Sequence, residues 1–369
     1  MKFSKTQITY TGKAEECTMT GDTRSYNERR WNPFLKKWIM IAPKRENRPL
    51  DVKGTSQADI GQNGKIQDQL KKSATKEKKF CPFCVGAPEV PEPYDVVMLG
   101  NKFPALSLDN KDVASKLDPG SPYKVAPAIG QQNVVLYTPD HGAKFRDLPV
   151  NHICKLVKLW KEKYMEIGNI PEIAYVFEFE NRGELIGVSL AHPHGQIYSF
   201  SWIPTYIKTE LDAFKEYMEH TNRCLLCDIV KEEMEQEVRI IQQNTSFISC
   251  VPFFASWPHE VHIYSRKHLL SFEDFDDKII HDFASILKDL NARYDALYPG
   301  MDMSFVMAIH QAPTDGKDYS YYHFHVEFYP PLRKVDVRKF AAGVELGTGT
   351  WINSSLPETF AQKMRAVLD

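Results

Sequence analysis

The chain has 369 residues, of which 43% are hydrophobic and 25% are charged, and its formal net charge is −2 at pH 7. This length predicts about two domains, each large enough for its own core. The near-neutral charge provides no global basic field for binding nucleic acid. No segment approaches the ~20 consecutive apolar residues of a membrane span, so we expect no membrane partner.

The cysteines indicate a compartment. There are seven, and residues 1–17 contain neither an apolar run nor the small-residue cleavage site of a secretory signal. An odd number of cysteines without such a signal predicts reduced thiols in a cytoplasmic protein.

Taken in chain order, the elements begin with a polar extension at 1–25 and a first strand at 38–42. A lysine-rich segment at 51–79 is expected to be a solvated loop. Two units with the same layout follow: a strand-like segment, an amphipathic helix with apolar residues near i, i+3 and i+4, and a β-rich segment. The strands are expected at 134–137, 174–179, 260–264 and 304–309, and the helices at 153–167 and 279–297.

The chain ends with Ser355-Leu-Pro-Glu358, a capping-box pattern that predicts a last helix at 359–368. The whole pattern predicts an α+β fold with mostly antiparallel sheets and crossing helices. We expect two tandem duplicated units, at 26–205 and 206–369, which can share one larger sheet.

Three motifs recur in the same order in both units. The first unit has Cys81-Pro-Phe-Cys84, Tyr137-Thr-Pro-Asp-His141 and His192-Pro-His194-Gly-Gln196, and the second has Cys224-Leu-Leu-Cys227, Tyr264-Ser-Arg-Lys-His268 and His323-Phe-His325-Val-Glu327. Sulfur and imidazole are the ligands of tetrahedral zinc, and a closed shell of four ligands is typical of structural sites.

The motifs therefore predict two zinc sites. We expect one at Cys81, Cys84, His141 and His192, and the other at Cys224, Cys227, His268 and His323. A C-x-x-C pair also fits a redox dithiol, but no thioredoxin-like βαβ pattern surrounds either pair. The remaining alternative, buried thiols and core histidines, is disfavoured because the whole motif set is duplicated.

The first H-x-H also has the features of a nucleophile. In a strand, His192 and His194 face the same side, so one can reach a metal and the other a substrate. Gly195 would let a phosphate approach the main chain, and Gln196 can donate an amide hydrogen bond to a phosphoryl oxygen. A neutral imidazole can attack phosphorus and form a phosphoramidate. The alternative is a pair of core histidines on a buried strand.

The second H-x-H lacks these features, because Phe324, Val326 and Glu327 replace the proline, glycine and glutamine. An ionised glutamate would repel a phosphate. We therefore expect that the second unit kept a metal and lost the nucleophile.

The segment Ser189-Leu-Ala-His-Pro-His-Gly-Gln-Ile197 resembles the active-site signature of galactose-1-phosphate uridylyltransferases, within the histidine-triad superfamily. The likeness includes Phe179-Glu-Asn-Arg-Gly183 and Phe328-Tyr-Pro-Pro-Leu332 and runs from about Arg30 to Leu368. The resemblance implies histidine-triad-like units and a ping-pong reaction in a homodimer. UDP-glucose would uridylylate His194 and release glucose 1-phosphate, and galactose 1-phosphate would then leave as UDP-galactose.

The same resemblance implies substrate-binding roles. Arg48, Asn101 and Phe103 would lie near the uridine or its phosphates; Asn181, Ser189 and Gln196 would hold the phosphoryl groups; Lys339 and Glu345 would lie near the hexose or phosphate, reaching the neighbouring subunit's site in a dimer. The alternatives are core packing for Phe103, turn chemistry for Asn181 and a solvated charge for Arg48.

Some features depart from the bacterial pattern of this family, in which a glutamate and three histidines hold a second metal. Glu210, His310 and His325 match three of these positions, and Glu327 falls where the last histidine is expected. The second C-x-x-C and the tail Glu345-Leu-Gly-Thr-Gly-Thr-Trp-Ile-Asn353 resemble the two-zinc branch that includes plant ADP-glucose phosphorylase-like proteins.

These departures leave several questions open. The second metal is zinc, iron or another ion. A phosphorylase or adenylyltransferase acting on ADP-glucose-like sugar nucleotides is the alternative activity. A zinc-stabilised nucleic-acid-binding module is disfavoured by the charge.

Overall fold

The computed structural model describes residues 27–43, 81–110, 121–188, 190–335 and 337–368, so the extension and the loop expected at 1–25 and 51–79 lie outside it. Its centre is a nine-stranded sheet in which every neighbouring pair is antiparallel. In spatial order the strands are β3 (Val97–Gly100), β4 (Gly130–Leu136), β6 (His194–Phe200), β5 (Tyr175–Arg182), β10 (Phe305–His310), β11 (His325–Tyr329), β9 (Val261–Ser265), β8 (Phe247–Cys250) and β7 (Ile240–Gln243). This confirms the predicted α+β class.

The two halves of the chain share this sheet. The first four strands in spatial order come from residues 97–200 and the other five from residues 240–329. They join where β5 pairs with β10, with Phe179 opposite Ala308 and Arg182 opposite Phe305.

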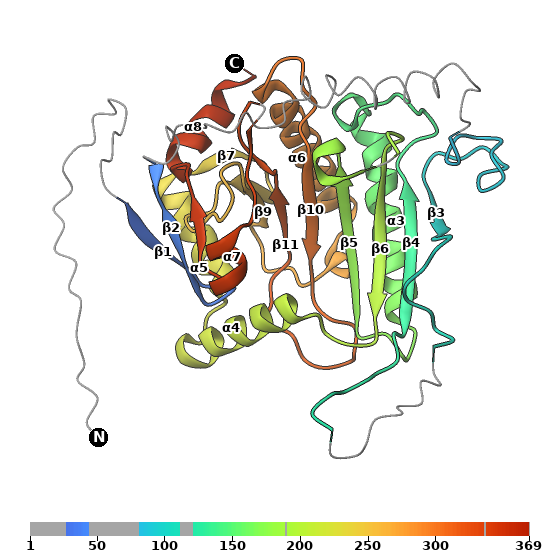
Figure 1. Cartoon of the computed structure of the whole chain (residues 1–369), viewed down its shortest axis with the longest axis horizontal. Coiled ribbons are helices and arrows are strands. Elements are labelled where there is room, and N and C mark those ends of the chain that lie inside the picture. Colours follow the sequence, from blue (N-terminus) through green and yellow to red (C-terminus); the bar gives the residue numbers. More distant parts are fainter. Residues whose placement is uncertain (1–26, 44–80, 111–120, 189, 336, 369) are drawn as a thin grey trace.

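Two long helices cover one face of the sheet, α3 (Val150–Gly168) and α6 (Asp277–Leu297), and both lie behind the strands in Figure 1. Each buries its apolar stripe in one continuous core, as the i, i+3, i+4 spacing predicts. Both helices begin two or three residues before the predicted starts. Asp276 caps α6 by accepting a hydrogen bond from the Ile279 amide at 2.7 Å.

Within the described ranges, helices cover the opposite face over the second half of the sheet only. There, α4 (Thr205–Thr221), α5 (Leu225–Gln236) and the segment around Phe34 form a second core with β8 and β9. Phe34 lies between β1 (Glu28–Asn32) and β2 (Lys37–Ile41), which form a small sheet with β14 (Trp351–Asn353). Over the first half, the side chains on this face, among them Phe177, Phe179 and Tyr198, are only partly buried.

The remaining elements are short. They are the hairpin β12 (Leu332–Lys334) and β13 (Val337–Arg338), helices α7 (Gly343–Thr348) and α8 (Pro357–Ala366), and the 3-10 turns η2 (Phe145–Asp147), η3 (Glu184–Ile186) and η4 (Phe272–Asp274). Among the residues described, no helix combines the length and the apolar character that crossing a membrane requires.

The predicted capping box of the last helix is wrong, because α8 begins at Pro357 after Leu356 and has no side-chain cap. Glu358 instead accepts hydrogen bonds from two buried arginines. Arg30 donates to it at 2.9 and 3.2 Å, and Arg239 donates at 3.0 Å. The carboxylate thus joins β1, the segment after α5 and α8.

Glu358→Ala is expected to destabilise the protein by about 3 kcal/mol, near the lower end for breaking a buried ion pair, because Arg30 keeps Glu28 and Arg239 keeps Glu233. Urea unfolding followed by tryptophan fluorescence would measure this. The matched control is Asp212→Ala, which removes an exposed pair with Lys208 and should change stability by less than about 0.5 kcal/mol. Equal effects of the two substitutions would contradict the prediction.

Candidate active site and metal centres

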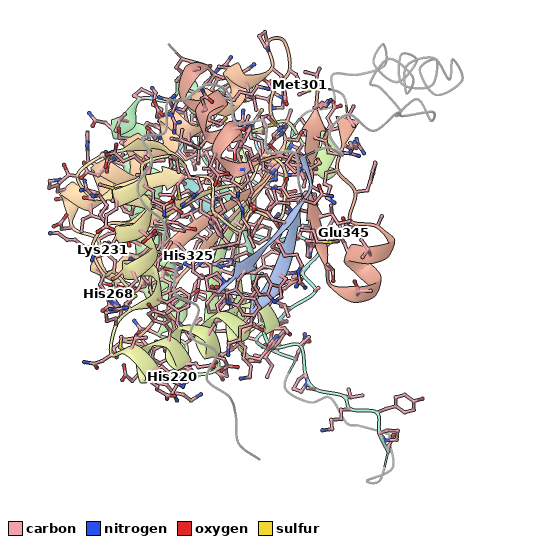
Figure 2. All side chains as sticks on the ribbon, turned by 90° about the vertical axis from the view of Figure 1, so that its left-hand side faces the viewer. His220, Lys231, His268, Met301, His325 and Glu345 are labelled. Carbon is pink, nitrogen blue, oxygen red and sulfur yellow. The ribbon has the colours of Figure 1, made fainter. Side chains whose placement is uncertain are left out.

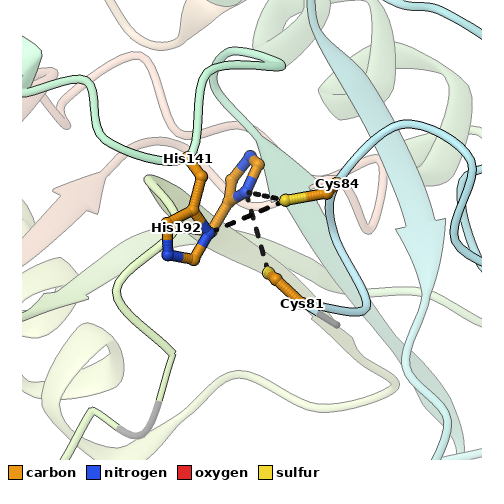
Figure 3. A group of neighbouring side chains, drawn as sticks. All are labelled: Cys81, Cys84, His141 and His192. Carbon is orange, nitrogen blue, oxygen red and sulfur yellow. Dashed lines mark hydrogen bonds between the residues drawn. The ribbon is translucent and has the colours of Figure 1, made fainter. Parts of the chain in front are cut away.

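The first predicted ligand set comes together at the sheet edge. Donor atoms of Cys81, Cys84, His141 and His192 all lie within 4.8 Å of one another (Figure 3). The sulfur-to-Nδ1 distances are 3.8 Å for Cys81 with His192, 3.7 Å for Cys84 with His141 and 3.9 Å for Cys84 with His192. Zinc about 2.3 Å from sulfur and about 2.1 Å from nitrogen has tetrahedral S···N edges of about 3.6 Å. The donor set and its spacing therefore fit zinc.

The second set has the same arrangement. Cys224, Cys227, His268 and His323 lie within 4.8 Å, with sulfur-to-Nδ1 distances of 3.4, 3.5 and 3.7 Å. Cys224 immediately precedes α5, and Cys227 lies in its first turn. This group also fits a tetrahedral zinc.

The outer hydrogen bonds of the two sets match as well. His192 Nε2 donates to the Thr138 carbonyl at 2.8 Å, and His323 Nε2 donates to the Ser265 carbonyl at 3.0 Å. A proton held on Nε2 leaves the Nδ1 lone pair facing the sulfurs, which is how outer partners orient metal-bound histidines.

A third group is fully internal. Donor atoms of Glu210, His310, His325 and Glu327 lie within 4.8 Å of one another, and all four residues are buried. Burial alone lowers the pKa of His310, but the charges of Glu210 and Glu327 raise it to about 9. Sequence reasoning noted Glu327 only as a departure from a histidine, whereas the structure places its carboxylate within the group.

One buried nitrogen atom in this third group indicates that the group suits a metal. His325 Nε2 is buried without a hydrogen-bond partner among the described residues, and it faces Glu210 at 3.8 Å and Glu327 at 3.7 Å. Burial lowers the pKa of His325 to about 3, so the ring is neutral. A buried polar atom without a partner is rare, and a divalent cation would satisfy it. Two imidazoles and two carboxylates suit zinc, iron or manganese.

The candidate nucleophile stands at the start of β6. His194 Nδ1 donates to the His192 carbonyl at 2.8 Å, which places the proton on that nitrogen and leaves the Nε2 lone pair available. Burial lowers the pKa of His194, which favours the neutral ring. His325 makes the same bond to the His323 carbonyl at 3.0 Å. The two H-x-H segments therefore orient their second histidine in the same way.

The second histidines of the two H-x-H segments, His194 and His325, differ in burial. His325 is fully buried, with the rings of Phe34 at 5.2 Å and Phe214 at 6.4 Å. His194 is only partly buried and lines a cavity of about 520 Å³. A substrate can approach His194 and cannot approach His325.

This cavity lies at the strand ends. Besides His194 it is lined by Asn181 and Gly183, and by the polar side chains of Lys144, Glu180, Arg182 and Arg338. Burial raises the pKa of Glu180 to about 7. Sequence reasoning did not name these four cavity-lining residues, although Glu180 and Arg182 lie inside the Phe179-Glu-Asn-Arg-Gly183 segment that resembles the uridylyltransferases.

Comparison with known proteins supplies the family. Residues 17–204 match the sequence model for the N-terminal domain of galactose-1-phosphate uridyl transferase, and residues 210–369 match that for its C-terminal domain. The chain belongs to the galactose-1-phosphate uridylyltransferase family. The Thermotoga maritima galactose-1-phosphate uridylyltransferase is 34% identical over 339 residues, covering 92% of this chain and 98% of the relative.

Solved structures agree with this family. A uridylyltransferase structure superposes with a TM-score of 0.73 at 32% identity, covering 93% of this chain and 98% of the other. An Arabidopsis thaliana ADP-glucose phosphorylase with bound ADP-glucose also has a TM-score of 0.73, at 25% identity, covering 92% of this chain and 99% of the other.

The substrate-binding residues that the family resemblance implied do not all lie at the cavity. Gln196 is two residues after His194 on β6 and faces the same side. Phe103 is 85% exposed, so its core-packing alternative is wrong, and its amide donates to Asn101 Oδ1 at 2.9 Å. Lys339 is ion-paired with Glu345, which lies on α7 (Figure 2), and neither lines the cavity. Arg48 and Ser189 lie outside the described residues.

Gly195 has a role that differs from the one expected. A Cβ atom there would lie 2.1 Å from Tyr137 Oη and 3.0 Å from the Phe179 carbonyl oxygen. Gly195 faces the side covered by α3, opposite to His194, so the missing side chain makes room for Tyr137 and not for a phosphate. In the second half Val326 fits at this place because Tyr264 packs in the core on the other face.

Proposed function

We propose that this protein transfers UMP from UDP-glucose to galactose 1-phosphate in two displacements. In the first, His194 Nε2 bonds to the α-phosphorus, and the bond to the bridging oxygen breaks with its electron pair leaving on glucose 1-phosphate. In the second, a phosphate oxygen of galactose 1-phosphate attacks the phosphoramidate and releases His194 with UDP-galactose. The supporting observation is the bond from His194 Nδ1 to the His192 carbonyl, which leaves the Nε2 lone pair free on a residue that lines the cavity.

Other residues take roles that follow the family pattern. Gln196, Asn181 and Ser189 hold the phosphoryl groups, and Arg48, Asn101 and Phe103 receive the uridine. A side chain as exposed as Phe103 has an apolar face available for a ribose or base. Lys339 and Glu345 lie away from the cavity, which agrees with a role in the neighbouring subunit's site of a homodimer.

We place the unit boundary between residues 205 and 206, so that 26–205 carries the nucleophile and 206–369 the second and third metal groups. The reduced thiols expected from the odd cysteine count support a cytoplasmic location.

The two Cys₂His₂ groups have a structural role, because they hold segments that carry site residues. Zinc in the two Cys₂His₂ groups would fix the segments that carry His192 and His323, each two residues before the second histidine of its H-x-H. The third group would take zinc, iron or another divalent ion.

Metal analysis of the purified protein is expected to find three ions per chain, at least two of them zinc. His310→Ala should remove one ion and leave the two zinc ions of the Cys₂His₂ groups, because it changes only the Glu210–His310–His325–Glu327 group. Elemental analysis by mass spectrometry measures this directly. A count of two ions in both proteins would show that the third group is a hydrogen-bonded core and not a metal site.

The alternative activity is phosphorolysis of a sugar nucleotide such as ADP-glucose. It is favoured by the second Cys₂His₂ group and by the likeness to the Arabidopsis enzyme. The lower identity to that enzyme, 25% against 34% for the T. maritima uridylyltransferase, puts it second.

Intact-mass measurement after mixing with a sugar nucleotide tests both activities. UDP-glucose without acceptor is expected to add one uridylyl group, which galactose 1-phosphate discharges as UDP-galactose. ADP-glucose is the matched control and should label the protein far more slowly. Labelling by ADP-glucose, with discharge by inorganic phosphate, would replace the proposed function with the alternative.

A further inference from the structure

The cavity beside His194 contains three cationic side chains, from Lys144, Arg182 and Arg338. A transfer between phosphates needs positive charge where the leaving oxygen develops negative charge. Which of the three can supply it depends on the partners that each already has.

Lys144 and Arg182 are already paired. Lys144 Nζ donates to Asp302 Oδ1 at 2.6 Å across the cavity mouth. Arg182 donates to both oxygens of the buried Asp295 at 2.7 and 2.8 Å, and to Asn291 Oδ1 at 2.6 Å. Their charges are therefore largely neutralised within the chain.

Arg338 differs from both. Within the part of the chain that the structure describes, its guanidinium has no hydrogen-bond or ion-pair partner, and its side chain is half-buried. It comes from β13, opposite Leu332 of β12, and both residues of this pair line the cavity. The next residue, Lys339, is paired with Glu345 outside the cavity.

The surrounding carboxyl groups do not offset this charge. Asp302 is held by Lys144, Glu184 has a partner of its own, and burial raises the pKa of Glu180 to about 7. A guanidinium matches a phosphate with two parallel hydrogen bonds, and an anion that displaces water from this cavity would compensate the desolvated charge.

We propose that Arg338 binds the phosphate of the hexose 1-phosphate, which leaves in the first displacement and attacks in the second; this rests on the proposed function. A free sugar phosphate is close to a dianion at pH 7, whereas the same phosphorus within UDP-glucose carries one charge. The contact therefore matters most when hexose 1-phosphate enters. Arg338 makes no bond to the reacting phosphorus and does not exchange a proton.

The test isolates the second displacement. Protein labelled with UDP-glucose is freed of nucleotide, and discharge of the uridylyl group is followed by intact mass against galactose 1-phosphate concentration. Arg338→Gln should raise the half-saturating concentration about 10- to 100-fold, as expected for a lost charged, bidentate contact, while complete labelling by UDP-glucose is retained. Arg338→Lys keeps the positive charge but cannot donate two parallel hydrogen bonds to one phosphate. Its half-saturating concentration should lie between those of the wild type and Arg338→Gln.

The control is Lys208→Gln, which removes a cation that Asp212 pairs with outside the cavity; its half-saturating concentration should change less than about threefold. A half-saturating concentration for Arg338→Gln within twofold of wild type overturns the inference. Should Arg338→Gln fail to fold, Arg338→Lys decides, with the same twofold limit. Absence of labelling in the wild type would instead reject the proposed function.

Discussion

His194→Ala is expected to abolish labelling by UDP-glucose and to lower turnover by about 10⁴-fold or more, because it removes the atom that would form the covalent intermediate. The ring makes few packing contacts that the fold requires: it is only partly buried, lies against Phe83 at 5.3 Å and lines the cavity. Stability should therefore change little. Intact mass and initial rates with UDP-glucose and galactose 1-phosphate measure the effect.

His325→Ala is the matched control, because its second-half position and its bond to the preceding carbonyl are the same. It should still be labelled on His194. Its main effect should be a loss of stability of about 2–4 kcal/mol, because it leaves a cavity among Phe34, Phe214 and Tyr322. The assignment of the nucleophile fails if His325→Ala abolishes labelling and His194→Ala does not.

Repeating patterns in the sequence predicted the two long helices and both Cys₂His₂ groups. The apolar spacing of 153–167 and 279–297 identified α3 and α6, because burial against one sheet face demands it. The recurring motifs named both Cys₂His₂ groups, since metal ligands must have specific residue types. The capping box at Ser355 failed because Arg30 and Arg239 bind Glu358 from distant elements.

Other parts of the site depend on contacts that sequence spacing does not encode. Lys144 and Arg338 enter the cavity from a loop and a short hairpin, neither of which has a periodic pattern. The Y-x-x-x-H motifs have identical spacing, yet Tyr264 pairs with His325 whereas Leu136, the residue before Tyr137, pairs with His194. This offset of one residue places the two tyrosines on opposite faces of the sheet, because side chains alternate along a strand.

That offset makes Gly195, next to the nucleophile, sensitive to substitution. A Cβ atom in Gly195→Ala would lie 2.1 Å from Tyr137 Oη and 2.9 Å from Cζ. The tyrosine cannot yield, because it is buried with Phe145 at 5.9 Å and Trp160 at 5.9 Å. The strand must move instead and take His194 with it, and a shift of about 1 Å costs about 10²-fold in rate. We expect a loss of that size in labelling by UDP-glucose.

A second substitution separates this collision from other effects of alanine. Tyr137→Phe removes the atom at 2.1 Å, so Gly195→Ala with Tyr137→Phe should recover about tenfold of the lost rate, while the contacts with the ring Cζ at 2.9 Å and the Phe179 carbonyl at 3.0 Å remain. Gly142→Ala, where the nearest atom is 3.7 Å away, should be labelled like the wild type. Recovery in the double variant would show that the tyrosine beneath the strand sets the position of His194. An equally inactive double variant would assign the requirement for glycine to the contacts that remain, with the ring Cζ and with the Phe179 carbonyl.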